Sequence, residues 1–437
     1  MNNEMLEVRK HISALRMAED VKSLLQYGPR HAGTSNEHKA ASYVELEMRE
    51  TLSLVQVDRV EGINAWKLHD TRVKVIDPVE QELTSIALLG SASTPKEGLT
   101  AELCYVGRGT FEDYNESDLA GKIIMRDPPR ALTLDNTSDE SSPQGPVDSS
   151  IKRGAVGFLE HARIPGKILQ MPLLSGPLGL PVPAVAVTYE DGQYLKELLR
   201  EWYAIPKGSK RTADHQPVNI RIWVDAESYP SYGLNVIGRI EGEEKKGEII
   251  CLVAHHDNAN GPGACDNATA VAVNLETARV LSKMSKPKRT IEFLSCTGEE
   301  YGEAGSFEYV KRYIDHQTSR YKGCVNMDLV GNGDHLYYIK ESICMGKLVQ
   351  NDAILNEKLV GTCNDLGYHI EGTPLEYAGD DGPFIMAGVP TAYLCKLISS
   401  TWPYLHTYMD DFSVVDINGL SVMVEIVANY IWRLANE

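Results

Sequence analysis

The chain has 437 residues, of which 43% are hydrophobic and 7% aromatic, and 61 acidic against 43 basic residues give a formal net charge of −18. This length favours two domains, or one large domain with an insertion. The acidic balance argues against a nucleic-acid partner, because phosphate backbones are bound by clustered Lys and Arg. The same excess is also what disperses an ordinary soluble protein.

Three further features of composition set the class of protein. No apolar stretch approaches the roughly 18–20 residues of a membrane-spanning helix, so no membrane partner is expected. Residues 1–19 are rich in charge and lack the apolar core of a signal peptide, which predicts a cytoplasmic protein. The eight cysteines are dispersed and never form a Cys-x-x-Cys pair, which favours reduced, buried thiols over disulfides or cysteine-bound zinc.

The chain opens with two predicted helices, because apolar residues recur at helical spacing in residues 12–25 and 40–48. A breaker cluster, residues 28–33, separates them. Thr34 and Glu37 have the capping-box spacing that starts the second helix.

After about residue 60 the pattern changes to short β-rich runs broken by Gly and Pro, and helical periodicity is sparse. These runs are residues 103–107, 123–125, 156–159 and 182–187. Residues 127–150 are rich in Pro, Ser, Thr, Asp and Asn, which predicts a long loop that could reach an active site.

From about Tyr232 onward, apolar strands alternate with helical segments. Residues 249–254 form a continuous apolar run, typical of a strand buried on both faces of a parallel sheet. The same alternation continues with a helix at 271–281, a strand at 290–295, a helix at 306–314, and strands at 323–327 and 389–394. This order indicates an α/β domain.

Metal-ligand side chains follow the ends of these predicted strands. They are His255, His256 and Asp257 after the first, Asp266 at the next helix start, Glu299 and Glu300 after the second, Asp328 after the third, and His406 with Asp410 later. Ligands of open α/β sheets gather at the carboxyl ends of strands. Imidazoles and carboxylates in this position are the ligand set of one zinc, or of two zincs that share a carboxylate.

Such a set suits hydrolysis. Two divalent metals about 3.5–4 Å apart can polarise a carbonyl and lower the pKa of a shared water. A carboxylate that is not a ligand must then take the proton from this water and pass it to the leaving amine. The adjacent pair Glu299-Glu300 allows one side chain to bind metal while its neighbour stays free.

Five successive motifs resemble those of the M28 family of zinc metallopeptidases, which are chiefly aminopeptidases. They are Ala254-His255-His256-Asp257, Ala264-Cys265-Asp266-Asn267, residues 298–306, Asn326-Met327-Asp328, and His406-Thr407 with Asp410. The resemblance extends from Tyr232 to the C-terminus and, more loosely, over residues 30–48. It implies a zinc exopeptidase fold, a mixed and mostly parallel sheet flanked by helices, made by residues 1–60 and 231–437. Residues 61–230 resemble the β-rich protease-associated (PA) domain that is often inserted in these enzymes.

Carried onto this sequence, the resemblance implies two zinc ions per chain. The implied roles are His255 and Asp328 as ligands of one zinc, Glu300 and His406 as ligands of the other, Asp266 as the bridge, Glu299 as general base and acid, and Asp257 as the partner of the other nitrogen of His255. In the family the peptide bond after the bridging aspartate is commonly cis, which makes Asp266–Asn267 a candidate for that conformation.

Several histidines compete for these roles. His256 could be the ligand in place of His255, although the His-x-Asp spacing favours His255. His335 and His369 compete with His406, which is favoured because the residues after it match the family spacing.

One segment departs from the family pattern. Where relatives often have Ser-Asp-His before Pro-Phe, Asp381 stands at the position of the histidine. With Glu376 nearby, this predicts a substrate pocket that prefers a basic residue or a free amine. Asp380 and Asp410 either support the site from behind or are plain surface charges.

The sequence therefore predicts a dizinc aminopeptidase that removes N-terminal residues from peptide substrates. The alternatives are a related M28 carboxypeptidase, dipeptidase or single-zinc cyclase, or a receptor-like homologue without catalysis, which the complete ligand set argues against. The sequence leaves open the preferred residue, the peptide length, the native metal, the oligomeric state and the role of the insertion.

Overall fold

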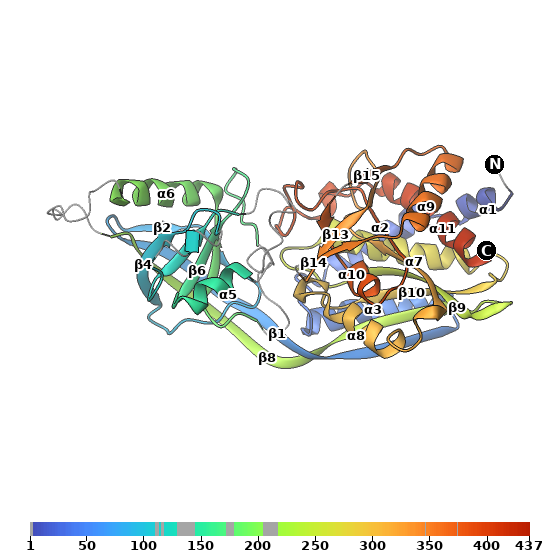
Figure 1. Cartoon of the computed structure of the whole chain (residues 1–437), viewed down its shortest axis with the longest axis horizontal. Helices are drawn as coiled ribbons and strands as arrows, with labels where there is room; N and C mark the ends of the chain where they lie inside the picture. The colour runs from blue at the N-terminus through green and yellow to red at the C-terminus, as the bar shows by residue number, and fades with distance from the viewer. Residues whose placement is uncertain are drawn as a thin grey trace. The chain divides into compact units, whose positions relative to one another are not determined.

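The computed structural model describes residues 3–109, 113–114, 118–128, 145–171, 179–203, 217–345, 347–373 and 375–437. The chain forms two compact units, Met1–Ile63 with Ser231–Glu437, and Asn64–Pro230 (Figure 1). The strands β1 (Leu54–Asp77) and β8 (Asn219–Ile240) pass from one unit into the other. The units thus divide after Ile63 and Pro230, where the sequence texture suggested boundaries after residues 60 and 230.

The first unit, which we call the catalytic unit, is built on a mixed sheet of order β15-β12-β17-β11-β9-β10-β8. Its strands besides β8 are β9 (Lys245–His255), β10 (Arg289–Cys296), β11 (Tyr321–Met327), β12 (Tyr337–Ile339), β15 (Glu371–Thr373) and β17 (Thr391–Cys395). The central strands β10, β9, β11 and β17 are parallel, whereas β8 is antiparallel to β10 and β12 is antiparallel to β17 and parallel to β15. The predicted mixed, mostly parallel sheet is therefore confirmed.

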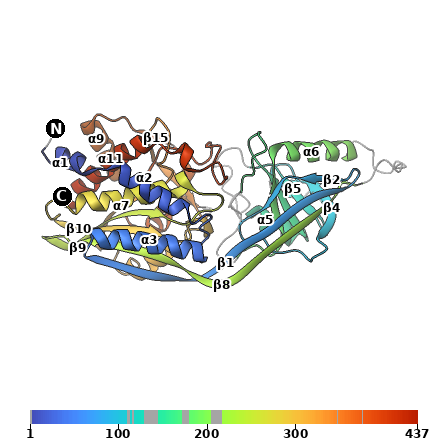
Figure 2. The ribbon, with the colours of Figure 1, turned by 180° about the vertical axis from the view of Figure 1, so that it is seen from behind.

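Helices cover both faces of this sheet. Ile250, Leu252 and Ala254 of β9 pack in one apolar core with α2, α3, α7, α9 and α11, while Cys251 and Val253 pack on the other face against α8 and α10. In Figure 1, α8 and α10 lie on the face of the sheet toward the viewer. Figure 2 gives the opposite view, in which α2, α3 and α7 lie on the face toward the viewer. Because β9 is buried on both faces, its sequence has no polar alternation.

The catalytic unit contains the four helices that the sequence predicted and further helices that it did not predict. They are α1 (Asn3–His11), α2 (Ala14–Leu25), α3 (Ser35–Thr51), α7 (Thr269–Leu281), α8 (Ala304–Tyr313), α9 (Ala353–Leu366), α10 (Asp381–Met386) and α11 (Ile417–Asn436). The side chain of Thr34 accepts a hydrogen bond from the backbone N–H of Glu37, which confirms the predicted cap of α3.

A small second sheet also belongs to the catalytic unit, in the order β14-β13-β16. Its strands are β13 (Glu341–Cys344), β14 (Lys347–Gln350) and β16 (Glu376–Tyr377). β16 pairs in parallel with β13, Glu376 lying opposite Ser342.

In the second unit the strand order continues from β8 as β4-β5-β6-β7-β3, and β4 is antiparallel to β8. Strands β4 (Leu99–Tyr105), β5 (Ile123–Arg126), β6 (Gly157–His161) and β7 (Ala184–Val187) are parallel, β3 (Ser85–Ala87) is antiparallel to β7, and β2 (Gln81–Leu83) pairs with β1. That residues 61–230 are a PA domain stays a prediction.

Two helices of the second unit differ from what the sequence predicted. The helix α6 (Tyr189–Tyr203) lies where helical periodicity is sparse, because only Gly192, Leu195 and Leu199 form its buried stripe. The helix α5 (Gly145–Lys152) overlaps the loop predicted at 127–150, so that prediction is wrong for residues 145–150. Residues 129–144 of the predicted loop lie outside the described residues.

Two further expectations can be checked in the described residues. All eight cysteines are buried and free, as predicted. No helix in the described part of the chain is long and apolar enough to span a bilayer.

Candidate metal centre

Three strands bring ligand-type side chains to one edge of the catalytic unit's sheet. His255 is the last residue of β9, and Asp328 directly follows β11. Glu299 and Glu300 lie in the short helix η3 (Glu299–Tyr301), which follows β10 after the left-handed Gly298, at φ 68°. Because these parallel strands end at the same edge, the four side chains lie close together.

Asp266 comes from the turn η2 (Ala264–Ala268), which leads from β9 into α7. The carboxylate of Asp410 holds this turn, since its Oδ1 accepts the N–H of Cys265 at 2.7 Å and its Oδ2 accepts the N–H of Asp266 at 3.0 Å. Asp410 is therefore a buried support of the site and not a surface charge. The peptide bond Asp266–Asn267 is cis, as the family resemblance implied.

His406 reaches the same place from the loop between β17 and α11. Its backbone is left-handed, at φ 53°. The side-chain amide of Asn260 donates to the carbonyl of His406 at 3.2 Å, which ties this loop to the loop after β9.

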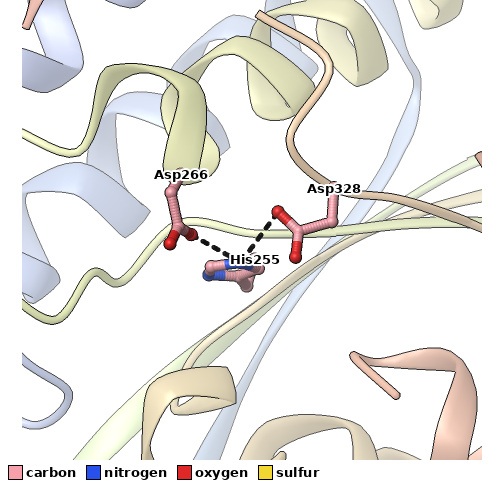
Figure 3. Close-up of side chains that lie close together, drawn as sticks. All are labelled: His255, Asp266 and Asp328. Atoms are coloured by element: carbon pink, nitrogen blue, oxygen red, sulfur yellow. Dashed lines mark ion pairs between the residues drawn. The ribbon is translucent and has the colours of Figure 1, made fainter. Parts of the chain in front are cut away.

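The five predicted ligands form two groups that share Asp266: His255, Asp266 and Asp328, and Asp266, Glu300 and His406. Nε2 of His255 lies 3.5 Å from Oδ1 of Asp266 and 3.6 Å from Oδ1 of Asp328, as Figure 3 shows. Nε2 of His406 lies 3.1 Å from Oδ2 of Asp266 and 3.3 Å from Oε2 of Glu300. The two oxygens of Asp266 thus face two different groups.

The spacing and the unmet hydrogen-bonding capacity of these atoms fit metal binding. A tetrahedral zinc with bonds of about 2.0–2.2 Å sets neighbouring ligand atoms roughly 3.3–3.6 Å apart. The four separations above, from 3.1 to 3.6 Å, lie close to this range. Nε2 of His255 and Oε2 of Glu300 are buried without a hydrogen-bond partner in the described structure, which is costly unless another ligand binds them.

Asp257 supports both the histidine and the glutamate pair. Its carboxylate accepts the backbone N–H of Glu299 at 3.2 Å and that of Glu300 at 3.3 Å. Nδ1 of His255 lies 3.3 Å from the backbone carbonyl of Asp257 and 3.6 Å from its carboxylate. Asp257 is thus beside His255 as predicted, but its main-chain oxygen is the nearer partner and its carboxylate positions η3.

Glu299 differs from the ligands in its surroundings. Its Oε2 lies 3.9 Å from Nε2 of His255, and 14% of its side chain is exposed, against 1% for Glu300. Burial raises the pKa of Glu299 well above its ordinary value, and the negative charges of Glu300, Asp328 and Asp380 add to this rise. Glu299 is therefore at the centre but open to an incoming molecule.

The electrostatics of the ligand groups reflect an excess of carboxylates. Burial raises the pKa of Glu300 to about 8, with the charge of Asp266 adding to the effect, and burial also raises the pKa of Asp328. Burial opposes ionisation of Asp266 as well, but the hydrogen bond and charge of His406 outweigh it and lower the pKa of Asp266. This is the pattern expected of a site whose charge balance needs a cation.

The competing histidines lie elsewhere. His256 is buried and faces away from the ligands, with Nδ1 2.9 Å from Oγ of Ser295 and Nε2 3.0 Å from Oε1 of Glu37. His369 is exposed and pairs with Glu371, and neither it nor His335 belongs to a metal-type group of the described residues. Asp380, by contrast, is buried, and burial raises its pKa to about 7.

Arg30 is a functional residue whose role the sequence did not reveal. It is fully buried, and its guanidinium donates to the carbonyls of His256 at 2.8 Å, Pro262 at 2.6 Å and Gly263 at 3.0 Å. It therefore clamps the loop between His255 and Asp266 and places a positive charge behind the carboxylates. The sequence signals were a basic residue in a breaker cluster and the looser family resemblance of residues 30–48, and the loop carbonyls that accept its hydrogen bonds cannot be read from residue types.

A mostly parallel sheet whose carboxyl edge holds two imidazole–carboxylate groups joined by one aspartate is an arrangement that can hold divalent metal for hydrolysis. Residues 235–431, a little under half of the chain, match the model of peptidase family M28. The resemblance read from the motifs is thereby confirmed, and the protein is a metallopeptidase.

Similar proteins carry two kinds of name. Carboxypeptidase Q of Xenopus laevis is 26% identical over 404 residues, 89% of this chain and 79% of that protein. Aminopeptidase YwaD of Bacillus subtilis (strain 168) is 28% identical over 307 residues, 70% of this chain and 59% of that protein. The solved structure of an aminopeptidase from Aneurinibacillus sp. strain AM-1 has a TM-score of 0.73 and 26% identity, covering 99% of this chain and 96% of that one.

Proposed function

We propose that this protein is a dizinc aminopeptidase. The observation that carries the proposal is the position of Asp266, whose Oδ1 faces His255 and whose Oδ2 faces His406. A carboxylate that offers one oxygen to each of two ligand groups is suited to bridge two metal ions.

In this proposal His255 and Asp328 would hold one zinc, Glu300 and His406 would hold the other, and Asp266 would be shared by both groups. Bound zinc would supply Lewis acidity for the hydrolysis of the scissile amide. Glu299 would take the proton from the attacking water and deliver it to the leaving amine. Asp257 holds the backbone of Glu299 and Glu300 in place for this task.

The charge around the site favours an N-terminal over a C-terminal residue of the substrate. Glu299 and Asp328 would attract an ammonium and repel an α-carboxylate. A carboxypeptidase needs a cation for that carboxylate, and the buried cation next to the ligand loop, Arg30, already donates to three backbone carbonyls. Lys396, another buried cation, is likewise already paired, since its Nζ lies 3.7 Å from a carboxylate oxygen of Asp416.

Matched peptides test this proposal. One peptide is offered unblocked, N-acetylated, and C-terminally amidated, and metal content is measured on the same preparation. We expect about two zinc ions per chain, release of the first residue from the unblocked and amidated forms, and no release from the acetylated form. Release from the C-terminus of the acetylated form would instead establish a carboxypeptidase.

A further inference from the structure

Glu376 is a buried carboxylate with one oxygen left over. It lies in β16, and only 2% of the residue is exposed. Its Oε2 accepts the backbone N–H of Ser400 at 3.4 Å, whereas its Oε1 is buried and has no hydrogen-bond partner within the described ranges. Burial raises the pKa of Glu376, and hydrogen bonds from Ser400 and Ser399 partly offset this rise. Oε1 of Glu376 is thus the unmet atom of a polar group that includes the hydroxyl of Ser399.

The segment that contains Glu376 borders the metal centre. Gly379 follows Glu376 by three residues, and a Cβ placed on Gly379 would lie 3.5 Å from Oε1 of Glu299 and 3.9 Å from Oδ2 of Asp328. Three residues span at most about 10 Å, so the Cα of Glu376 is no farther than this from the chain beside the proposed general base. Tyr393 links the two places, because its hydroxyl donates to Oδ2 of Asp328 at 3.4 Å. Burial raises the pKa of Tyr393, and the charges of Asp328 and Glu376 are among those that add to this rise.

Asp381, the other acidic residue that the sequence singled out for the pocket, has hydrogen-bond partners on both of its oxygens. Its Oδ1 accepts the backbone N–H of Gly379 at 2.9 Å and lies 3.4 Å from the amide of Asn326, and its Oδ2 accepts the amide of Asn351 at 3.3 Å. The carboxylate of Asp381 is therefore engaged in fixing the start of α10. Of the two predicted pocket residues, Glu376 alone has an oxygen free for a ligand.

A buried carboxylate oxygen without a donor is expensive, and a hydrogen-bonding cation is the partner that best offsets the cost. Lysine and arginine carry their charge at the end of a long side chain, so they can present a cation to a carboxylate whose Cα lies within about 10 Å of Gly379. A hydroxyl such as that of Ser399 can accept a second N–H from the same cation.

We propose that Glu376 receives the side-chain cation of a lysine or arginine at the N-terminal position of the substrate. The inference rests on the proposed aminopeptidase function and adds the substrate class to it. Glu376 is then a specificity residue: it contacts the substrate side chain and takes no part in proton transfer.

The test compares wild type with Glu376→Gln and Glu376→Leu on lysyl, arginyl, leucyl and alanyl amidomethylcoumarins. Glu371→Gln is the matched control, since Glu371 is an exposed glutamate in β15. We expect wild type to favour the basic substrates. Both Glu376 variants should lose at least about 30-fold in kcat/KM on lysine and arginine, mostly through KM, and stay within about twofold on leucine. The leucine variant removes the buried charge altogether, so it guards against a folding defect.

Inhibitor binding gives a second readout that does not depend on turnover. Lysine hydroxamate should bind wild type more tightly than leucine hydroxamate, and this preference should vanish in Glu376→Gln. A wild type that prefers leucine, or equal losses on all four substrates, would overturn this inference and leave the aminopeptidase proposal standing. A wild type that cleaves none of the unblocked substrates would overturn both.

Discussion

The strand β10 carries one buried acidic group in its middle and is followed by another beyond its carboxyl end, and the two have different surroundings. In the middle of the strand, Glu292 is fully buried and receives hydrogen bonds from Arg239 on one oxygen and from Tyr309 on the other. Beyond its carboxyl end, Glu300 is equally buried, yet its Oε2 has no partner in the described structure. A buried charge that its own chain satisfies is a structural element, whereas one left unsatisfied marks a place for a ligand.

The contrast extends to the cations of each cluster. Arg239 forms an ion pair with the carboxylate of Glu292, and neutralises it directly. Arg30 lies behind the metal centre, but its guanidinium donates hydrogen bonds to the carbonyls of residues 256, 262 and 263 and not to the carboxylates. Its charge stabilises the carboxylates from a distance while their oxygens stay free. Arg30 therefore supports the metal ligands without competing for them.

The largest effect is expected at Glu299, which separates proton transfer from metal binding. Glu299→Gln should lower kcat by about 10⁴-fold, because the amide cannot take a proton from water, while zinc content stays at the wild-type level. Steady-state kinetics and metal analysis on the same sample measure both quantities. Glu308→Gln in α8 is the control and should keep full activity. A kcat within a few-fold of wild type would remove Glu299 from the proposed role.

Removal of the metal should have the second-largest effect. It should destabilise the metal centre, whose carboxylates lack internal partners, and leave the Glu292 cluster unchanged. A ligand bound at 1,000 times its dissociation constant stabilises the folded state by about 4 kcal/mol, and apo protein loses this and gains repulsion among the carboxylates. Calorimetry with and without a chelator should show a large fall in Tm that added zinc reverses. An unchanged Tm would mean that the carboxyl-edge cluster is balanced without metal.

At the satisfied cluster, loss of the internal partner should be costly for stability alone. Arg239→Met leaves Glu292 buried without its cation, and we expect a loss of about 3 kcal/mol in the free energy of unfolding. Zinc content and KM should not change. The double variant Arg239→Met with Glu292→Gln should recover most of the loss in denaturant titrations. A lower zinc content in the single variant would show that the Glu292 cluster and the metal centre are not independent.

The same contrast explains what the sequence could predict. His255, Asp266, Glu300 and Asp328 were recognisable because a parallel sheet brings strand ends to one edge, so sequence order alone placed them together. Residues that act through backbone atoms were not recognisable. Arg30 binds backbone carbonyls 226 to 233 positions away. Every residue has a backbone carbonyl, so the residue type does not indicate which carbonyl will accept a hydrogen bond.

Elements with weak periodicity were missed for a related reason. The stripe of α6 is narrow, and most of its residues are polar, so its helix depends on packing against the strands of the second unit. The hydrogen-bond partners of Asp381 could not be predicted either, since its acidic type suggested a pocket and its carboxylate accepts the N–H of Gly379 and the amide of Asn351.

The smallest expected effect concerns Glu303, the residue that directly precedes α8. Burial raises its pKa from 4.5 to about 8, with the charges of Asp380 and Asp381 adding to the effect. The folded state therefore holds a proton that the unfolded state releases near pH 4.5, and stability falls as the pH rises toward 8. Glu303→Gln keeps a neutral side chain at every pH. Its unfolding free energy should match that of wild type at pH 4 and exceed it by about 1 kcal/mol at pH 9, a modest gain because Glu303 is partly exposed. A difference between the two proteins that does not change with pH would show that a neighbouring donor satisfies Glu303 in its charged form.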